Sequence, residues 1–229
     1  MERLKIEELS FSIDFALSQG FQFITCSDYV KIKNTLKNEK FIVLRVDVDY
    51  DLEASHSILK LLKHNGIKAS FFIRLHAESY NVFSKKHSSV IKQIISEGHE
   101  IGYHSELIDM GACFGISPSQ ILSQDMGLFE EFYGSKFNGS ASHREPEGKN
   151  NLLFWQGKNS TEYDLVYEAY DNSSQFGLFF NSFYISDSEW YNWKNFVNGV
   201  QLNTSFNLSE AIQNGYHHIY LLIHPDTYV

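Results

Sequence analysis

The chain has 229 residues, of which 43% are hydrophobic, and it carries a formal net charge of -9. This length and apolar content predict one globular domain over residues 1–229 and exclude a disordered or fibrous chain. The 19 Lys and Arg residues are scattered along the sequence rather than massed on one segment. The basic footprint of a nucleic-acid-binding protein is therefore missing, and we expect no nucleic-acid partner.

The amino-terminal residues 1–8 carry charges where a signal peptide needs an apolar core. No stretch approaches the roughly 20 apolar residues of a membrane-spanning helix. We therefore expect a cytoplasmic protein without a membrane span. The two cysteines lack a Cys-x-x-Cys spacing, so neither a disulfide framework nor a thiolate zinc site is predicted.

Helical and strand-like segments alternate along the chain. The expected helices cover residues 6–17, 27–36, 52–62, 88–96, 118–132 and 209–214. The expected strands cover residues 21–25, 41–46, 69–73, 100–103, 137–141 and 218–223. Between residues 155 and 206 the spacing of the apolar residues does not distinguish helices from strands. The repeating order predicts an α/β fold with a parallel sheet or barrel, and residues 1–40 form a lead-in that packs on it.

Two helix ends have local signals. Ser27 or Asp28 is expected to cap the start of the second helix, since short polar side chains bind its free N–H groups. Asn65-Gly66 is expected to close the third helix, because glycine readily adopts the left-handed conformation found there.

Val46-Asp47-Val48-Asp49 ends the apolar strand that begins at Phe41. Side chains alternate along a strand, so Asp47 and Asp49 project to the same side at its carboxyl end. Such a pair often caps a turn or a helix. It is also the arrangement in which one carboxylate binds a metal ion while the other acts as a base.

Further polar residues follow other predicted strands. His104 comes after residues 100–103, His143 and Arg144 follow residues 137–141, and His224 follows residues 218–223. In parallel α/β folds the functional residues collect at the carboxyl ends of strands. We therefore expect these side chains to meet Asp47 and Asp49 in one cavity.

Four motifs resemble those of the polysaccharide deacetylase superfamily, which is also called carbohydrate esterase family 4. They are Asp47-Val48-Asp49, Gly98-His99-Glu100-Ile101-Gly102-Tyr103-His104, Arg144-Glu145-Pro146-Glu147-Gly148 and Leu222-Ile223-His224. The likeness covers roughly residues 41–229. It is closest to a branch with Asp-x-Asp in the first motif, whose members are often tied to surface polysaccharide or lipopolysaccharide synthesis. The implied fold is an irregular (β/α) barrel of about seven strands.

The resemblance implies a role for each motif. Asp49 and His104 would bind a divalent metal ion, with zinc as the first candidate and cobalt, nickel, manganese or iron also compatible. Asp47 would act as the general base, and Arg144 would pair with it. His224 would protonate the leaving amine. His99 precedes its strand and is predicted to be a structural hydrogen-bonding residue.

The sequence departs from the family at one ligand. The common pattern has a second histidine four residues after the first, and Ile108 occupies that position here. A zinc site needs three protein ligands, so another residue must supply the third. We expect His143 to do so, with Glu106 and Asp109 as alternatives. Asp187-Ser188-Glu189-Trp190 weakly resembles the family motif that orients the catalytic histidine.

Two functions follow from these motifs. The first is a metal-dependent hydrolase that removes an N-acyl group, expected to be acetyl, from a sugar in a polysaccharide or its precursor. The alternative is a catalytically altered barrel that serves as a sugar-binding or assembly protein in glycan biosynthesis. The enzyme is favoured by the retention of Asp47, Asp49, His104, Arg144 and His224, whereas Ile108 favours the alternative.

Overall fold

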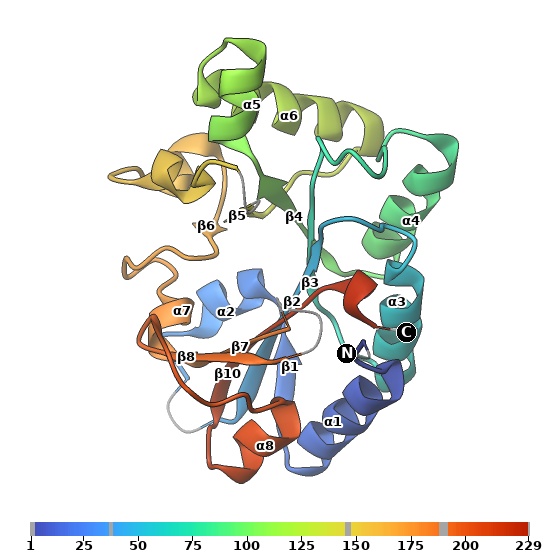
Figure 1. Ribbon diagram of the computed structural model, residues 1–229, viewed down its shortest axis with the longest axis vertical. Helices are drawn as coiled ribbons and strands as arrows, with labels where there is room; N and C mark the ends of the chain where they lie inside the picture. The colour runs from blue at the N-terminus through green and yellow to red at the C-terminus, as the bar shows by residue number, and fades with distance from the viewer. Residues whose placement is uncertain (1–2, 37–38, 145–147, 188–191, 229) are drawn as a thin grey trace.

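The computed structural model describes residues 3–36, 39–144, 148–187 and 192–228. Strands and helices alternate along the chain, which confirms the predicted α/β class (Figure 1). The helices are α1 (Ile6–Ser18), α2 (Cys26–Ile32), α3 (Ser55–Asn65), α4 (Lys85–Ser96), α5 (Leu107–Phe114), α6 (Pro118–Tyr133), α7 (Leu178–Asn181) and α8 (Leu208–Gln213). The strands are β1 (Gln22–Ile24), β2 (Phe41–Val48), β3 (Ser70–Ile73), β4 (Glu100–Ser105), β5 (Gly139–Ser142), β6 (Tyr167–Glu168), β7 (Phe183–Ser186), β8 (Lys194–Val197), β9 (Val200–Gln201) and β10 (His218–Ile223). Short 3-10 helices cover η1 (Asn151–Trp155), η2 (Ser160–Tyr163) and η3 (Pro225–Thr227).

The strands form one sheet in the order β6-β5-β4-β3-β2-β10-β7-β8-β9, and β1 pairs with the first half of β2. The β7–β8 and β8–β9 pairs are antiparallel, and the other pairs are parallel. The predicted parallel sheet is therefore confirmed. A barrel of about seven strands is not, because the pairings among the described residues run through nine strands from β6 to β9 without joining the two ends.

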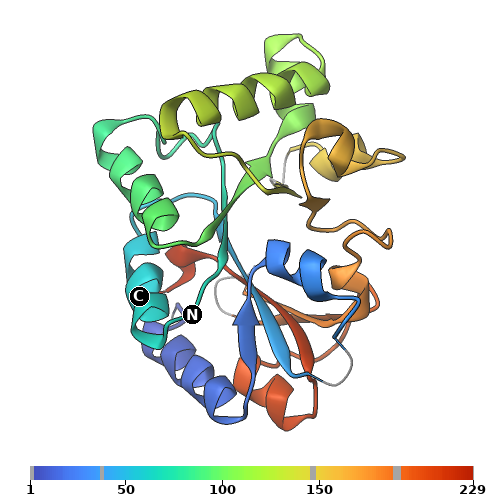
Figure 2. The same ribbon diagram turned by 180° about the vertical axis from the view of Figure 1, so that it is seen from behind.

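The two faces of the sheet bury different kinds of side chain. On β2, Ile42 and Leu44 belong to the core under the helices, whereas Val43 belongs to a second cluster on the opposite face. Helices α1, α3 and α4 lie one beside the next along the outer side (Figure 2). The inner face is rich in aromatic rings and also buries Arg45. Because side chains alternate, Arg45 shares its face with Asp47.

The end of α3 was predicted correctly, whereas the cap of α2 and the presence of α5 were not. Gly66 closes α3 with a φ of 65°, as expected. The cap of α2 is Thr25, whose hydroxyl accepts a hydrogen bond from the Asp28 N–H at 3.1 Å, so the prediction of Ser27 or Asp28 was wrong. Helix α5 was not predicted. Gly111 lies within it and disfavours an isolated helix, so the segment depends on contacts from elsewhere in the chain.

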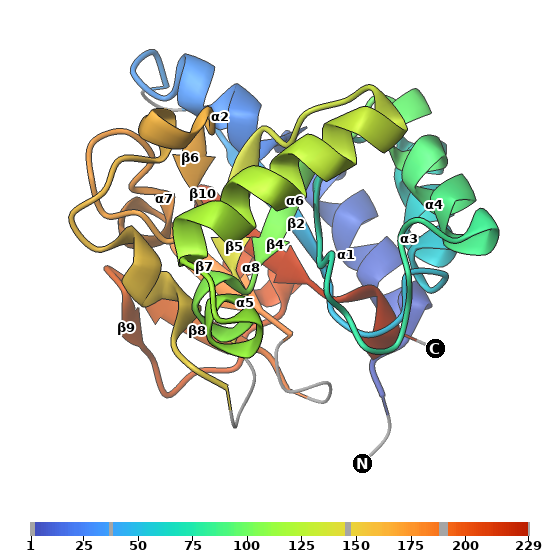
Figure 3. The same ribbon diagram turned by 90° about the horizontal axis from the view of Figure 1, so that it is seen from above.

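Helices α5 and α6 pack together, and α6 crosses above the sheet (Figure 3). The two ends of the chain meet where Leu4 and Tyr228 form an isolated parallel bridge. None of the helices in the described part of the chain is both long enough and apolar enough to span a bilayer.

Candidate functional site

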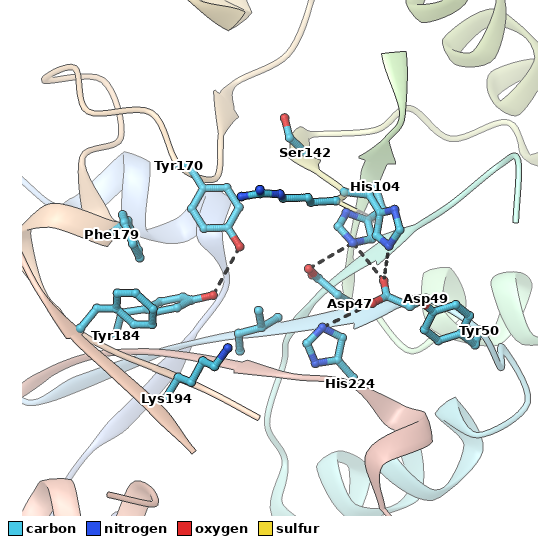
Figure 4. Close-up of a pocket in the computed structure, with 14 residues that line it drawn as sticks. Asp47, Asp49, Tyr50, His104, Ser142, Tyr170, Phe179, Tyr184, Lys194 and His224 are labelled. Carbon is cyan, nitrogen blue, oxygen red and sulfur yellow. Dashed lines mark hydrogen bonds and ion pairs between the residues drawn. The ribbon is translucent and has the colours of Figure 1, made fainter. Parts of the chain in front are cut away.

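A cavity of about 590 Å³ opens at the carboxyl ends of the parallel strands. Its walls combine acidic, histidine and aromatic side chains, most of which Figure 4 labels. The lining residues are Asp47, Asp49, Tyr50, His104, Ser142, His143, Arg144, Tyr170, Phe179, Tyr184, Lys194, Phe196, Leu222 and His224. The structure therefore brings together all six residues that the sequence analysis selected. Their common place is the sheet edge where the ends of β2, β4, β5 and β10 meet.

Three side chains on one side of the cavity could hold a metal ion. One ligand atom from each of Asp49, His104 and His143 lies within 4.8 Å of the others. Asp49 Oδ1 is 3.1 Å from His104 Nε2 and 3.7 Å from His143 Nε2. His104 and His143 are almost fully buried, so the ligand atoms meet in a sheltered corner.

Sheet geometry fixes the orientation of His104. Its Nδ1 lies 2.8 Å from the carbonyl oxygen of Ala141, which is its register partner on β5. A carbonyl can only accept, so Nδ1 carries the proton of the neutral ring and Nε2 keeps its lone pair. The nitrogen that faces Asp49 is therefore the one that can bind a metal.

The residues present fit a divalent cation. Asp49 Oδ1 is buried, and among the described residues it has no hydrogen-bond partner. Burial disfavours charge on Asp49, but the surrounding histidines hold the pKa of this carboxyl well below its ordinary value. Burial also opposes charge on His104, but the carboxylates of Asp47 and Asp49 raise its pKa. One carboxylate oxygen and two imidazole nitrogens are a donor set that zinc accepts.

Asp47 is held by an arginine that the sequence analysis missed. Arg45 Nε and Nη2 donate to the two carboxylate oxygens of Asp47 at 2.7 and 2.6 Å. Burial works against the charge on Asp47, yet this pair lowers its pKa below the ordinary value. The expected pairing of Asp47 with Arg144 is thus corrected, since Arg144 is exposed at the cavity wall. An arginine two residues before Asp47 in an apolar strand was the available signal, because both side chains must share one face.

His224 is fixed by Asp187. The Asp187 carboxylate lies 2.5 Å from His224 Nδ1 and accepts the His224 backbone N–H at 3.0 Å. Burial disfavours the protonated ring, but Asp187 and Asp49 together raise the pKa of His224 to about 10. His224 Nε2 faces the cavity, 3.6 Å from Asp49 Oδ2. Asp187 is thus where its weak motif suggested, whereas residues 188–190 of that motif lie outside the described residues.

The two alternative ligands have other partners. Glu106 accepts a hydrogen bond from Arg74 at 2.6 Å and lies 3.5 Å from His143 Nδ1. Although burial opposes its charge, His143 and Arg74 lower the pKa of Glu106 to about 2. Asp109 accepts hydrogen bonds from the Lys149 N–H and from Asn151. Neither carboxylate belongs to the set of atoms that converge on Asp49.

Asn151 supports the segment between His104 and His143. Its Oδ1 accepts the N–H groups of Ile108 and Asp109 at the start of α5, at 2.9 and 3.1 Å. Its Nδ2 donates to the carbonyl oxygen of His143 at 3.0 Å. Asn151 is fully buried, so one side chain both caps α5 and holds the backbone of His143.

The wall opposite the carboxylates is aromatic. The hydroxyl groups of Tyr170 and Tyr184 lie 3.4 Å apart, and Phe179 packs edge-on against Tyr184 (Figure 4). Lys194 extends into the cavity beside them. Aromatic faces with nearby polar groups are typical of sites that bind sugar rings.

The family model described as Polysaccharide deacetylase matches residues 34–166, which is more than half of the chain. No protein of curated function matches the chain in sequence.

Several solved structures resemble the fold. A mutant CE4 family pseudoenzyme with restored enzymatic activity is 15% identical, with a TM-score of 0.49, and the match covers 82% of this chain and 57% of that one. The chain thus spans less than two thirds of that protein's length. IcaB from Ammonifex degensii is 18% identical, with a TM-score of 0.48 and coverage of 66% and 72%. A family 4 carbohydrate esterase from Bacillus anthracis is 15% identical, with a TM-score of 0.48 and coverage of 94% and 77%.

Proposed function

Because the chain belongs to the polysaccharide deacetylase family, we propose that it is a metal-dependent hydrolase that removes an N-acetyl group from a sugar in a polysaccharide or its precursor. The observation that carries this proposal is the convergence of Asp49, His104 and His143, with a buried Asp49 oxygen aimed between the two rings. Three protein ligands with one position left open are the pattern of catalytic zinc sites.

A divalent ion, with zinc proposed first, would polarise the acetamide carbonyl and make an attacking water more acidic. Asp49, His104 and His143 would hold it. Asp47 is the proposed general base, because it lines the cavity and Arg45 binds both of its carboxylate oxygens and keeps them ionised. Arg45 thereby takes the orienting role that the sequence analysis gave to Arg144.

His224 is the proposed general acid. An acid must hold a proton before it donates one, and although burial opposes charge on the ring, the Asp187 carboxylate beside Nδ1 raises the pKa of His224 and favours the protonated imidazole. Asp187 fixes Nδ1, so Nε2 is the atom that would deliver the proton to the leaving amine. Base and acid are separate residues on β2 and after β10, which suits amide hydrolysis through a tetrahedral intermediate.

The aromatic wall supports a sugar substrate. Tyr170, Tyr184 and Phe179 offer ring faces, and Arg144 and Lys194 line the same cavity. We propose that Arg144 contacts the substrate rather than the base. The cellular setting we propose, from the sequence, is a cytoplasmic step in surface polysaccharide assembly.

The test is acetate release from a panel of N-acetylated sugars, oligosaccharides and nucleotide-linked sugars by the purified protein. We expect release that stops after treatment with a chelator and returns when zinc is added. The matched control is Asp49→Ala, which should release no acetate under either condition. A protein that binds these sugars without releasing acetate, whatever metal is added, would support the alternative binding function instead.

A further inference from the structure

His143 replaces a ligand that the family normally takes from the position of Ile108, and its backbone is well anchored. The His143 N–H donates to the carbonyl oxygen of Ser105 at 2.9 Å, and Asn151 binds its carbonyl oxygen. These bonds place the backbone of the residue, and its buried ring packs edge-on against the ring of His104. Which of the two ring nitrogens carries the proton is set by the group that faces Nδ1.

Glu106 is the charged group that faces that nitrogen. Its Oε1 lies 3.5 Å from His143 Nδ1, while His143 Nε2 points the other way, 3.7 Å from Asp49 Oδ1. A carboxylate can only accept, so it favours the tautomer with the proton on Nδ1 and the lone pair on Nε2. Carboxylate–histidine–metal arrangements of this kind raise the basicity of the ligating nitrogen.

Glu106 is itself held by Arg74, which also contacts the backbone of the ligand Asp49. Arg74 Nη2 donates to Glu106 Oε1 at 2.6 Å, and Arg74 Nη1 donates to the backbone carbonyl of Asp49 at 3.1 Å. Both side chains are about 95% buried, so the pair is shielded from water. Arg74 follows β3 directly, between the strands that carry Asp49 and His104.

We propose that Arg74 and Glu106 are positioning residues that join the segments of Asp49 and His143 and aim His143 Nε2 at the metal, which lets this chain build its site without a histidine at position 108. This inference rests on the metal site of the proposed function. It assigns Glu106 no direct bond to the metal.

The test compares zinc affinity, measured by competition with a chromophoric chelator, in the wild type, Glu106→Ala, Glu106→Gln and His143→Ala. We expect Glu106→Ala to raise the zinc Kd about 10–100-fold, in keeping with the loss of such a partner. Glu106→Gln keeps an acceptor for both Arg74 and His143, so its Kd should lie between those of the wild type and the alanine variant. His143→Ala should raise the zinc Kd more than either Glu106 variant does.

Cobalt separates a positioning role from a ligand role. With Co²⁺ at saturation, Glu106→Gln should reproduce the visible absorption spectrum of the wild type, because the ligand set is unchanged, whereas His143→Ala should not. The matched control is Asp125→Asn, which removes a buried carboxylate that binds His76 and Tyr103. It should leave the zinc Kd within about twofold of the wild type, although it lowers the melting temperature.

The outcomes are distinct. Wild-type zinc affinity in both Glu106 variants, with zinc bound by the wild type, would overturn this inference and leave the proposed function standing. A changed cobalt spectrum in Glu106→Gln would also overturn it, by making Glu106 a ligand. Absence of metal binding in the wild type would instead overturn the proposed function. If Glu106→Ala does not fold, Glu106→Gln decides between these results.

Discussion

The two histidines proposed as metal ligands, His104 and His143, are held by different parts of the molecule. His104 lies in β4, and its ring is set by the carbonyl of Ala141, which is its partner in the sheet register. His143 lies in the loop after β5, and its ring faces Glu106, which a buried arginine holds. One half of the site is therefore built by backbone pairing and the other by side chains from separate segments.

This difference teaches where the site is vulnerable. The hydrogen bonds between strands persist under most substitutions, because they join backbone groups that a change of side chain leaves in place. A ligand held by side chains depends on each partner, and removing one partner leaves the others buried and unsatisfied. In the sheet half, the ring of His104 should thus respond little to changes at other side chains, whereas in the loop half the ring of His143 should also respond to changes at residues that bind neither metal nor substrate.

The largest effect expected apart from ligand removal is in the sheet half. Asp47→Asn keeps the shape of the side chain but removes the base, so kcat should fall about 10²–10⁴-fold. Metal content should stay at the wild-type level, because Asp47 is outside the ligand set. Steady-state acetate release and elemental analysis on the same preparation check both statements. A variant that loses metal together with activity would place Asp47 among the ligands.

In the loop half, Asn151→Ala should lower both the stability of the fold and the affinity for zinc. It leaves the N–H groups of Ile108 and Asp109 and the carbonyl of His143 without their partner, at a cost of about 1–3 kcal/mol in the free energy of unfolding. The zinc affinity should fall because the backbone of His143 is released.

The matched control is Asn150→Ala, since Asn150 is exposed and bonds to the Leu152 N–H in the same segment. Chemical denaturation and zinc titration of the two variants separate these effects. Equal behaviour of the two would mean that the contacts of Asn151 do not support the loop.

The smallest effect concerns His99, which directly precedes β4 and has no proposed role in the site. Its Nδ1 accepts the Ala69 N–H at 3.2 Å, which bears out its expected structural role. Burial and the neighbouring Lys68 lower its pKa to about 4. The folded state keeps the ring neutral, whereas the unfolded chain takes up a proton below its ordinary pKa of about 6.5.

It follows that the free energy of unfolding should fall as the pH drops from about 6.5 to about 4. His99→Asn keeps an acceptor for Ala69 and does not titrate in this range, so its stability should depend less on pH. Chemical denaturation of both proteins at several pH values measures this dependence. The metal affinity of His99→Asn at neutral pH should equal that of the wild type. The same slope in both proteins would remove His99 as the cause.

The sequence predicted the sheet half of the site well. Alternation along the strand placed Asp47 and Asp49 on one face, and the apolar run before them identified β2. Local period also located most helices and strands to within a few residues. These features depend on residues that are close together in the sequence, so one sequence is enough to predict them.

The rest depended on contacts between distant segments. Helix α5 has Gly111 in its interior and receives its cap from Asn151, more than forty residues further along the chain. The pairs of Arg74 with Glu106 and of Asp187 with His224 likewise join separate loops. The exchange of Arg144 for Arg45 has a different cause, because motif order suggested Arg144 although local alternation along β2 already placed Arg45 on the face of Asp47.

The most direct test of the central claim is the metal content of the purified protein, measured beside Asp49→Ala, His104→Ala and His143→Ala prepared in the same way. The account predicts about one divalent ion per chain in the wild type and its loss in all three variants, with His143→Ala as deficient as Asp49→Ala. Unchanged metal in His143→Ala would contradict the Asp-His-His site. A wild type without metal, even after incubation with zinc, would contradict metal-dependent hydrolysis altogether.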